Sequence, residues 1–265
     1  AATSPSGAGA ILRVRERNAM PFTTDVQTMT KVGMERLLGH MEGPGPGRVT
    51  LYLPPASLPS IPTLLAGTDP ELADEVARKA DDTWSGAAVF LSADQAYVIA
   101  PPFPIRAESR SDGWDGAPLR ALLARRYLLG VVLLRLGAYA VGVLDGDELV
   151  ASKAYTRYVK GKHHAGGWSE QRFARRREKQ MRELFDEAGE VARDRLTPYE
   201  RRLDYIFLGG ERLTLLAFRK RCPYLERLAV EIAPRILEVE RPNRGALEGI
   251  PREVWKCRVT LVRRA

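Results

Sequence analysis

One segment of the chain combines residues that could do chemistry: KGKHHAGGWSEQRFARRREKQ, residues 160–180. Its glycine pair, Gly166-Gly167, lets the backbone approach a ligand closely and adopt positive φ angles. Several arginines follow in the first turns of a predicted helix, where the helix dipole disfavours cations. A bound phosphate would offset this unfavourable arrangement, because phosphates gain from both the helix N-terminus and the arginines. The segment therefore predicts an anion-binding loop.

The excess positive charge of the chain is concentrated around this segment. Residues 151–182 contain ten Lys and Arg against Glu170 and Glu178, a net charge of +8, while the rest of the chain has 31 basic and 31 acidic residues. A solvated helix face usually mixes both signs, whereas such a concentrated patch indicates a polyanionic partner, with nucleic acid as the first expectation. The residues expected to contact RNA are Lys160, Lys162, His163, Arg172, Arg175, Arg176, Arg177 and Lys179.

The elements predicted around this loop belong to a mixed β-sheet covered by helices. Asp145-Gly146 is a strong hairpin signal between two strands, and an amphipathic stripe continues the basic segment as one long helix. The order hairpin, long helix, strand, helix, strand is typical of such a sheet. The expected strands are Tyr127–Leu136, Ala138–Leu144, Glu148–Val159, Tyr205–Gly209, Ile236–Val239 and Trp255–Val262, and the expected helices are Leu119–Arg126, Ser169–Leu196 and Pro223–Ile232.

The first half of the chain predicts a small α+β domain. Residues 1–18 are interpreted as a disordered tail or a short strand, and residues 100–118 are rich in Pro, Gly and Ser, so the domain junction is expected there. The predicted fold class is a mixture of α+β and α/β in two domains, 19–118 and 119–265. The expected helices are Val26–Met41 and Leu72–Trp84, and the expected strands are Arg48–Leu53, Gly86–Ser92 and Gln95–Ile99.

Composition argues against several other classes of protein. Cys222 and Cys257 are the only cysteines and have no metal-ligand spacing, so a reduced, cytoplasmic protein is expected. No apolar run reaches the roughly 18 residues of a membrane span, and the N-terminus lacks the basic-then-apolar order of a signal peptide.

The adjacent histidines His163 and His164 would point to opposite sides of an extended chain, so they are not expected to share a metal ion. We therefore expect no metal site, no cofactor and no membrane contact.

The loop resembles the catalytic domain of eukaryotic and archaeal class I peptide release factors. That family carries Lys-His, two residues, then Gly-Gly-Gln-Ser and an Arg-Phe-Ala-Arg-x-Arg helix start. The matching residues here, without a gap, are Lys162, His163, Gly166, Gly167, Ser169, Arg172, Phe173, Ala174, Arg175 and Arg177. The segments YAVGVLDGDELVASK and YIFLGG in the second half, and VTLYLPP and AAVFLSADQAYVIAPPFPI in the first, extend the likeness over most of the chain.

One departure from the family pattern decides what the resemblance implies. Trp168 stands where the family has its catalytic glutamine, and Gln171 follows three residues later. A displaced glutamine is similar to that of the Vms-type branch, ribosome quality-control hydrolases that cut tRNA from stalled nascent chains. The best match is a bacterial Vms-like release factor with a Gly-Gly-x-x-x-Gln loop. The resemblance implies a catalytic role for Gln171, Gly166 and Gly167.

The same resemblance implies a partner and a reaction. The chain would act as a monomer at the peptidyl-transferase centre of the large ribosomal subunit, hydrolysing the ester of peptidyl-tRNA. The interval from Pro54 to Gly86 looks too short for the family's decoding helices, so release without codon reading is expected.

Several alternatives stay open at this point. Trp168 at the family's glutamine position favours a rescue factor that binds stalled ribosomes without hydrolysis, in which case Gln171 is an ordinary helix residue. An RNA endonuclease is a third possibility, but it would need convergent carboxylates and usually a metal. Trp168 is interpreted either as a stacking platform for a base or as a residue that packs the loop. Asp145 and Asp147 are interpreted as hairpin turn residues, and Tyr97, Tyr139 and Trp255 as core.

Overall fold

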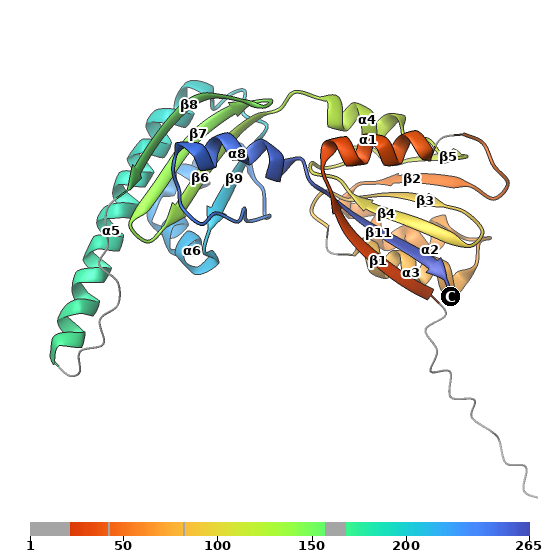
Figure 1. Cartoon of the computed structure of the whole chain (residues 1–265), viewed down its shortest axis with the longest axis horizontal. Helices are drawn as coiled ribbons and strands as arrows, with labels where there is room; N and C mark the ends of the chain where they lie inside the picture. The colour runs from red at the N-terminus through yellow and green to blue at the C-terminus, as the bar shows by residue number, and fades with distance from the viewer. Residues whose placement is uncertain (1–21, 42, 82, 157–167) are drawn as a thin grey trace, which may run out of the picture.

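The computed structural model describes residues 22–41, 43–81, 83–156 and 168–265, with the side chains of 168–174 left out of the description. Two β-sheets organise these residues, and helices flank each sheet (Figure 1). The mixed α and β fold class predicted from the sequence is therefore confirmed. The predicted tail, residues 1–18, lies outside the described residues. In the described part of the chain, every helix is too short or too polar to cross a membrane.

The first sheet is antiparallel and has the strand order β1-β11-β4-β3-β2-β5. Its two faces are both covered, which explains why β2 and β3 consist entirely of buried residues. α1 and α4 lie on one face, and α2 and α3 lie on the other (Figure 1). The strands are β1 Phe22–Met29, β2 Val49–Leu53, β3 Ala87–Leu91, β4 Gln95–Ala100, β5 Ser109–Asp112 and β11 Cys257–Arg264; the helices are α1 Lys31–His40, the 3-10 helix η1 Pro55–Ser60, α2 Ile61–Leu64, α3 Pro70–Ala80 and α4 Ala117–Ala124.

The second sheet is mixed and has the order β10-β9-β6-β7-β8. β6, β7 and β8 form an antiparallel meander, while β9 pairs in parallel with both β6 and β10. α5, α6 and α7 pack on one face, and α8 packs on the other. The strands are β6 Leu128–Arg135, β7 Ala138–Asp145, β8 Glu148–Thr156, β9 Tyr205–Gly210 and β10 Glu231–Ile232; the helices are α5 Trp168–Leu196, the 3-10 helix η2 Thr197–Tyr199, α6 Arg212–Arg221, α7 Pro223–Arg227 and α8 Arg244–Val254.

The predicted helix Val26–Met41 is wrong in its first part. Residues up to Met29 form β1, which pairs with β11 along its whole length. The helix begins only at Lys31, because Thr30 caps it: the Thr30 Oγ1 accepts a hydrogen bond of 3.2 Å from the backbone N–H of Gly33.

The end of the chain also differs from the prediction. The last strand, expected within the second half, inserts between β1 and β4 of the first sheet. Ile236–Val239 is not a strand, since only Leu237 forms an isolated bridge with Gly209. The predicted helix Pro223–Ile232 ends at Arg227, while α6, α8 and β5 were not predicted. The division of the chain into domains at residue 118 stays a prediction.

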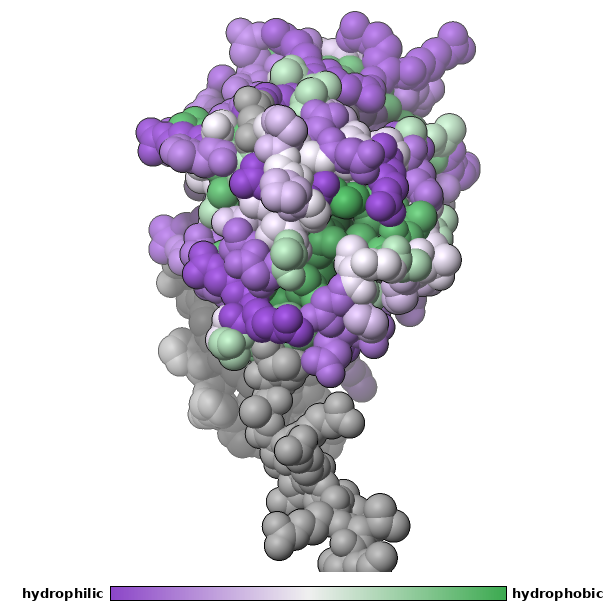
Figure 2. All heavy atoms as spheres, turned by 90° about the vertical axis from the view of Figure 1, so that its right-hand side faces the viewer, coloured by the Kyte–Doolittle hydropathy of each residue, from purple (hydrophilic) through white to green (hydrophobic). Residues whose placement is uncertain are grey.

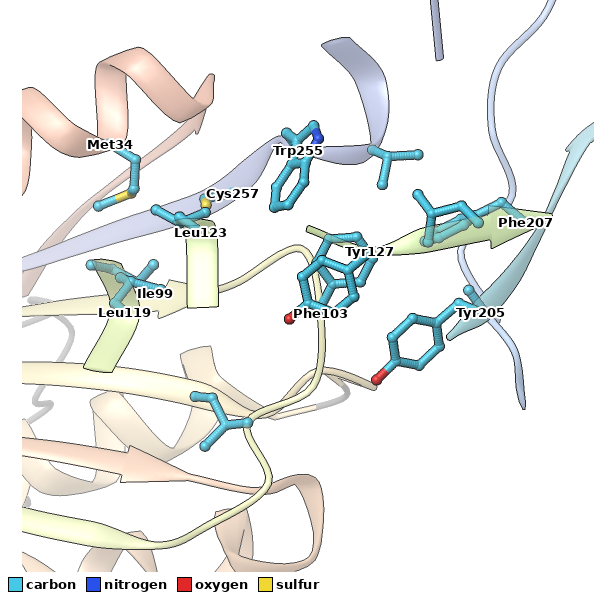
Figure 3. Packing of buried hydrophobic residues seen from close by; sticks show 14 of the residues in the cluster. Met34, Ile99, Phe103, Leu119, Leu123, Tyr127, Tyr205, Phe207, Trp255 and Cys257 are labelled. Atoms are coloured by element: carbon cyan, nitrogen blue, oxygen red, sulfur yellow. The ribbon is translucent and has the colours of Figure 1, made fainter. Parts of the chain in front are cut away.

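An aromatic cluster joins the two sheets (Figure 3). Phe103, which follows β4, is fully buried and stacks on Tyr127 with ring centroids 3.8 Å apart. Its ring also meets Tyr205 at 5.5 Å and Trp255 at 5.1 Å. Arg106 adds a polar contact, donating a hydrogen bond of 2.5 Å to the Tyr205 hydroxyl. One hydrophobic core therefore runs from the first sheet into the second.

Candidate RNA-binding and catalytic site

The predicted functional segment lies between β8 and α5. Five of the predicted site residues, Lys160, Lys162, His163, Gly166 and Gly167, lie outside the described residues. Trp168, Gln171 and Arg172 belong to the helical backbone of α5, but their side chains are outside the description. The structure thus confirms the helix predicted after the loop, while the roles of all these residues stay predictions.

Among the side chains that the structure describes, those of the C-terminal half anchor α5 to the second sheet. The apolar stripe predicted for this half is buried against β6, β7, α6 and α7, beginning at Leu184. Residues 168–180 precede the anchored part, and at 1.5 Å per residue they span about 20 Å. Figure 1 shows this end of α5 extending away from the sheet. The buried residues of this half are Leu184, Phe185, Ala188, Val191, Ala192 and Leu196, while Met181, the first residue of the predicted stripe, is only partly buried.

The described cations of the projecting part all face solvent. Arg175, Arg176, Arg177 and Lys179 are exposed. Lys179 lies 3.8 Å from the carboxylate of Glu183, a weak surface pair of the i, i+4 type. The three arginines form no ion pair with the carboxylates of the described residues. Guanidinium groups that pair with no described carboxylate, on a part of the helix that precedes its buried residues, can bind an external polyanion.

An ion pair ties the base of this helix to α6. Arg221 donates two hydrogen bonds to Asp186, with N–O distances of 2.6 and 2.7 Å. The hydrogen bonds from Arg221 lower the pKa of the Asp186 carboxyl, so the pair stays charged at neutral pH. Phe185 packs edge-on against Phe218 beneath it, with centroids 5.8 Å apart. These contacts hold α5 in place directly after its basic part, which ends at Arg182.

Of the residues interpreted as turn or core residues, Asp145, Tyr139 and Trp255 have those roles in the structure, while Tyr97 is only half-buried. Asp145 pairs with Arg126 at 2.5 Å beside the hairpin turn, where Gly146 has a φ of 61°. Tyr139 and Trp255 are buried, and burial raises the pKa of the Tyr139 hydroxyl. Among the residues that the structure describes, no group of three His, Cys, Asp or Glu side chains is placed to hold a metal ion.

The end of the molecule formed by the first sheet is shown in Figure 2. Its surface is mostly polar, with one apolar area among polar side chains. The projecting end of α5 lies at the opposite end (Figure 1). The residues expected from the sequence to contact RNA did not include two exposed cations at the base of the projecting part, Arg182 of α5 and Lys220 of α6, although Arg182 belongs to the basic segment. Lys220 carries no sequence signal, because it lies on α6, far from the basic segment along the chain.

Comparison with known proteins points to translation factors. The family model for the Actinobacteria/chloroflexi VLRF1 release factor matches residues 127–260. Peptide chain release factor subunit 1 of Archaeoglobus fulgidus is 37% identical over 93 residues, which are 35% of this chain and 23% of that protein. The protein of the same description from Aeropyrum pernix is 27% identical over 168 residues, 62% of this chain and 44% of that protein. The chain thus spans less than half the length of these curated relatives.

Two solved structures share low sequence identity with the chain. The archaeal translation termination factor aRF1 is 18% identical with a TM-score of 0.36, covering 86% of this chain and 73% of that one. Pelota of Archaeoglobus fulgidus is 13% identical with a TM-score of 0.27, covering 87% of this chain and 62% of that one.

Proposed function

The chain belongs to the Actinobacteria/chloroflexi VLRF1 release factor family, and on that premise we propose that it hydrolyses peptidyl-tRNA on large ribosomal subunits that carry a stalled nascent chain. Its partners are the ribosomal RNA at the peptidyl-transferase centre and the peptidyl-tRNA, and it acts in the cytoplasm as a monomer. The observation that supports this proposal is the projecting part of α5, which presents exposed arginines, unpaired with any carboxylate that the structure describes, directly after the Gly-Gly-x-x-x-Gln segment.

The chemistry is the hydrolysis of an ester. Water adds to the peptidyl carbonyl carbon, the bond from that carbon to the ribose oxygen breaks, and the ribose oxygen takes up a proton. Gln171 cannot act as a general base, because a neutral amide is scarcely basic. Its role is to orient the water or to donate a hydrogen bond to the developing oxyanion. Gly166 and Gly167 let the backbone approach the ester closely.

The cations of α5 position this chemistry. Arg175, Arg176, Arg177 and Lys179 contact phosphates, which fixes the helix on RNA without reading a sequence. Such contacts release counterions, so binding depends steeply on salt. If about six phosphates are contacted, raising salt from roughly 50 to 200 mM should weaken binding about 10³-fold.

We further propose that release does not depend on a codon. Between Pro54 and Gly86 the described chain forms η1, α2 and α3, the longest of which has 11 residues. These helices pack their apolar residues on the first sheet. A stop codon placed in an empty A site should therefore leave the rate of release unchanged, and stimulation by the codon would contradict this part of the proposal.

The decisive experiment measures single-turnover release from purified large subunits that carry a stalled peptidyl-tRNA. Gln171→Ala should slow release by about 10²–10³-fold, the usual effect of losing one oxyanion-type donor, while binding persists. Gln180→Ala is the matched control, because position 180 lies on the opposite face of the same helix, nine residues further on. Release by the control should stay close to that of the native protein.

One observation favours a second candidate function. Trp168 occupies the position of the catalytic glutamine of class I peptide release factors. This is expected for a factor that binds stalled ribosomes and recruits other proteins without hydrolysis. In that case the native protein would bind the particles and release no tRNA, and Gln171→Ala would change nothing. Slow release by the native protein that is insensitive to Gln171→Ala would also remove this residue from the mechanism.

A further inference from the structure

A longitudinal row of positions connects the predicted catalytic glutamine to the base of α5. Positions 171, 175 and 182 of the helix are separated by four and seven residues, so they share one face. Eleven residues of α-helix separate the first from the last, a distance of about 16 Å. Arg175 and Arg182 are both exposed. A polyanion that follows this face away from Gln171 meets Arg175 first and Arg182 second.

The row ends at an open depression between α5 and α6. Within it, Arg221 and Asp186 neutralise each other through their two hydrogen bonds. Arg182 and Lys220 are exposed and form no ion pair with the described carboxylates, so they leave the depression with a net positive charge. The lining residues are Arg182, Phe185, Asp186, Ala217, Lys220, Arg221 and Pro223.

The charge of α5 changes sign at the same place. Residues 168–182 include six Lys and Arg and two Glu, whereas residues 183–196 include five acidic and two basic residues. Phosphates are attracted along the first part and repelled by the second. The first buried side chain of the described helix, that of Leu184, also lies at this boundary. The depression is therefore the innermost place on α5 where RNA would be held.

We propose that this depression binds the phosphate backbone of ribosomal RNA and limits how far α5 enters the large subunit. The inference rests on the proposed function and adds to it a docking site at the base of the helix. We choose ribosomal RNA as the partner for a geometric reason. If α5 enters a cavity of the large subunit with residue 168 first, the ribosomal RNA that forms the wall of this cavity lies beside the whole helix, including its base. The peptidyl-tRNA, in contrast, presents its ester to the tip.

The test measures dissociation constants for vacant large subunits between 50 and 200 mM salt. Arg182→Ala and Lys220→Ala should each weaken binding about five- to eightfold at 0.1 M salt, the effect of losing one phosphate contact with a salt slope of roughly 0.7–0.9. Arg201→Ala is the matched control, because Arg201 is exposed beyond the opposite end of α5. This control should bind like the native protein and keep its salt slope.

The outcomes separate this inference from the proposed function. Unchanged binding by the Arg182→Ala, Lys220→Ala double variant, or an equal loss in the Arg201→Ala control, would overturn the docking site. A loss seen only on particles that carry peptidyl-tRNA would assign the phosphates to tRNA and overturn the choice of ribosomal RNA. Weaker binding of the double variant together with no release by the native protein would support the docking site and refute hydrolysis.

Discussion

Truncation of Phe103 to Ala tests whether the two sheets form one cooperative unit. The side chain is fully buried, and its ring meets Tyr127, Tyr205, Phe207 and Trp255 at centroid distances between 3.8 and 6.2 Å. Core Phe→Ala changes cost about 3–5 kcal/mol. Four aromatic partners place Phe103 in the upper part of that range, because such pairs contribute beyond their buried area. We therefore expect the free energy of unfolding to fall by about 4–5 kcal/mol.

This loss is large compared with the stability of a typical protein, about 5–15 kcal/mol. For a chain of this size, roughly 2–4 °C in Tm accompanies each kcal/mol, so Tm should fall by roughly 8–20 °C. The assay is urea unfolding followed by far-UV circular dichroism and by tryptophan fluorescence. The native protein should give coincident transitions, because its core is continuous between the sheets. Phe103→Ala should lower the midpoint and separate the two curves.

Phe218→Ala is the matched control. Phe218 is also fully buried, but it packs with Phe185 between α5, α6 and the second sheet, away from the junction. It should cost a similar free energy while the two transitions stay coincident. The reasoning is refuted if Phe103→Ala costs less than about 1 kcal/mol, or if the native protein itself unfolds in two separate steps.

Other predictions follow from single positions. Gly210 has a φ of 130°, and a Cβ there would lie 2.0 Å from a carbonyl oxygen of β6, so Gly210→Ala should cost at least about 2–3 kcal/mol in thermal unfolding. Gly249→Ala, inside α8 with nothing within 4 Å, should instead stabilise by about 0.5–1 kcal/mol, and a loss would contradict this. Burial raises the pKa of Tyr127 to about 12. The unfolded chain gives up this proton near pH 10, so stability should decline from pH 10 to 12, and Tyr127→Phe should reduce the decline in denaturation curves. Burial also raises the pKa of the Cys222 thiol and brings that of Cys257 to about 12, so a thiol reagent at pH 8 should modify both only after unfolding; rapid reaction of the native protein would refute this.

The elements best predicted from the sequence are those whose signals are local. β6, β7 and β8 were found from alternating and apolar runs around the Asp145-Gly146 turn, and α5 was found from its apolar stripe. The membership of β11 in the first sheet could not be found in this way. β11 pairs with β1, in which Phe22 lies opposite Arg264, more than 200 residues away along the chain. No local pattern records a pairing over that distance.

The missed helices have their own physical reasons. α6 leaves Leu213 and Leu216 exposed, so its apolar residues do not form a single stripe. α8 contains Pro251 within its last turns, a residue that normally indicates the end of a helix. α1 was predicted too long because Val26 and Met29 of β1 fall by chance at helical spacing from the true helix. The bounds of these helices thus depend on packing and on caps such as Thr30, which the apolar pattern alone does not show.

The candidate site was found from the sequence only in part. The concentration of cations and the spacing of Gly166, Gly167 and Gln171 were visible in the residues themselves. That the basic part of α5 stands clear of the core is a consequence of where its buried stripe begins, at Leu184. The depression with Lys220 depends on α6 returning to α5 through the ion pair of Arg221 with Asp186, which no sequence pattern indicates.

The return of β11 to the first sheet restricts the orientation of the second sheet, which carries α5. The chain leaves the first sheet after α4 and comes back after α8, so the second sheet is attached at two points. Phe103 and Tyr127 stack between these points, and Arg106 binds Tyr205 across the junction. A helix carried on a single flexible linker would lose orientational freedom when it docked, at a cost to affinity. Two chain connections and a shared core restrict that freedom before docking, so more of the energy of the proposed phosphate contacts would be retained as binding.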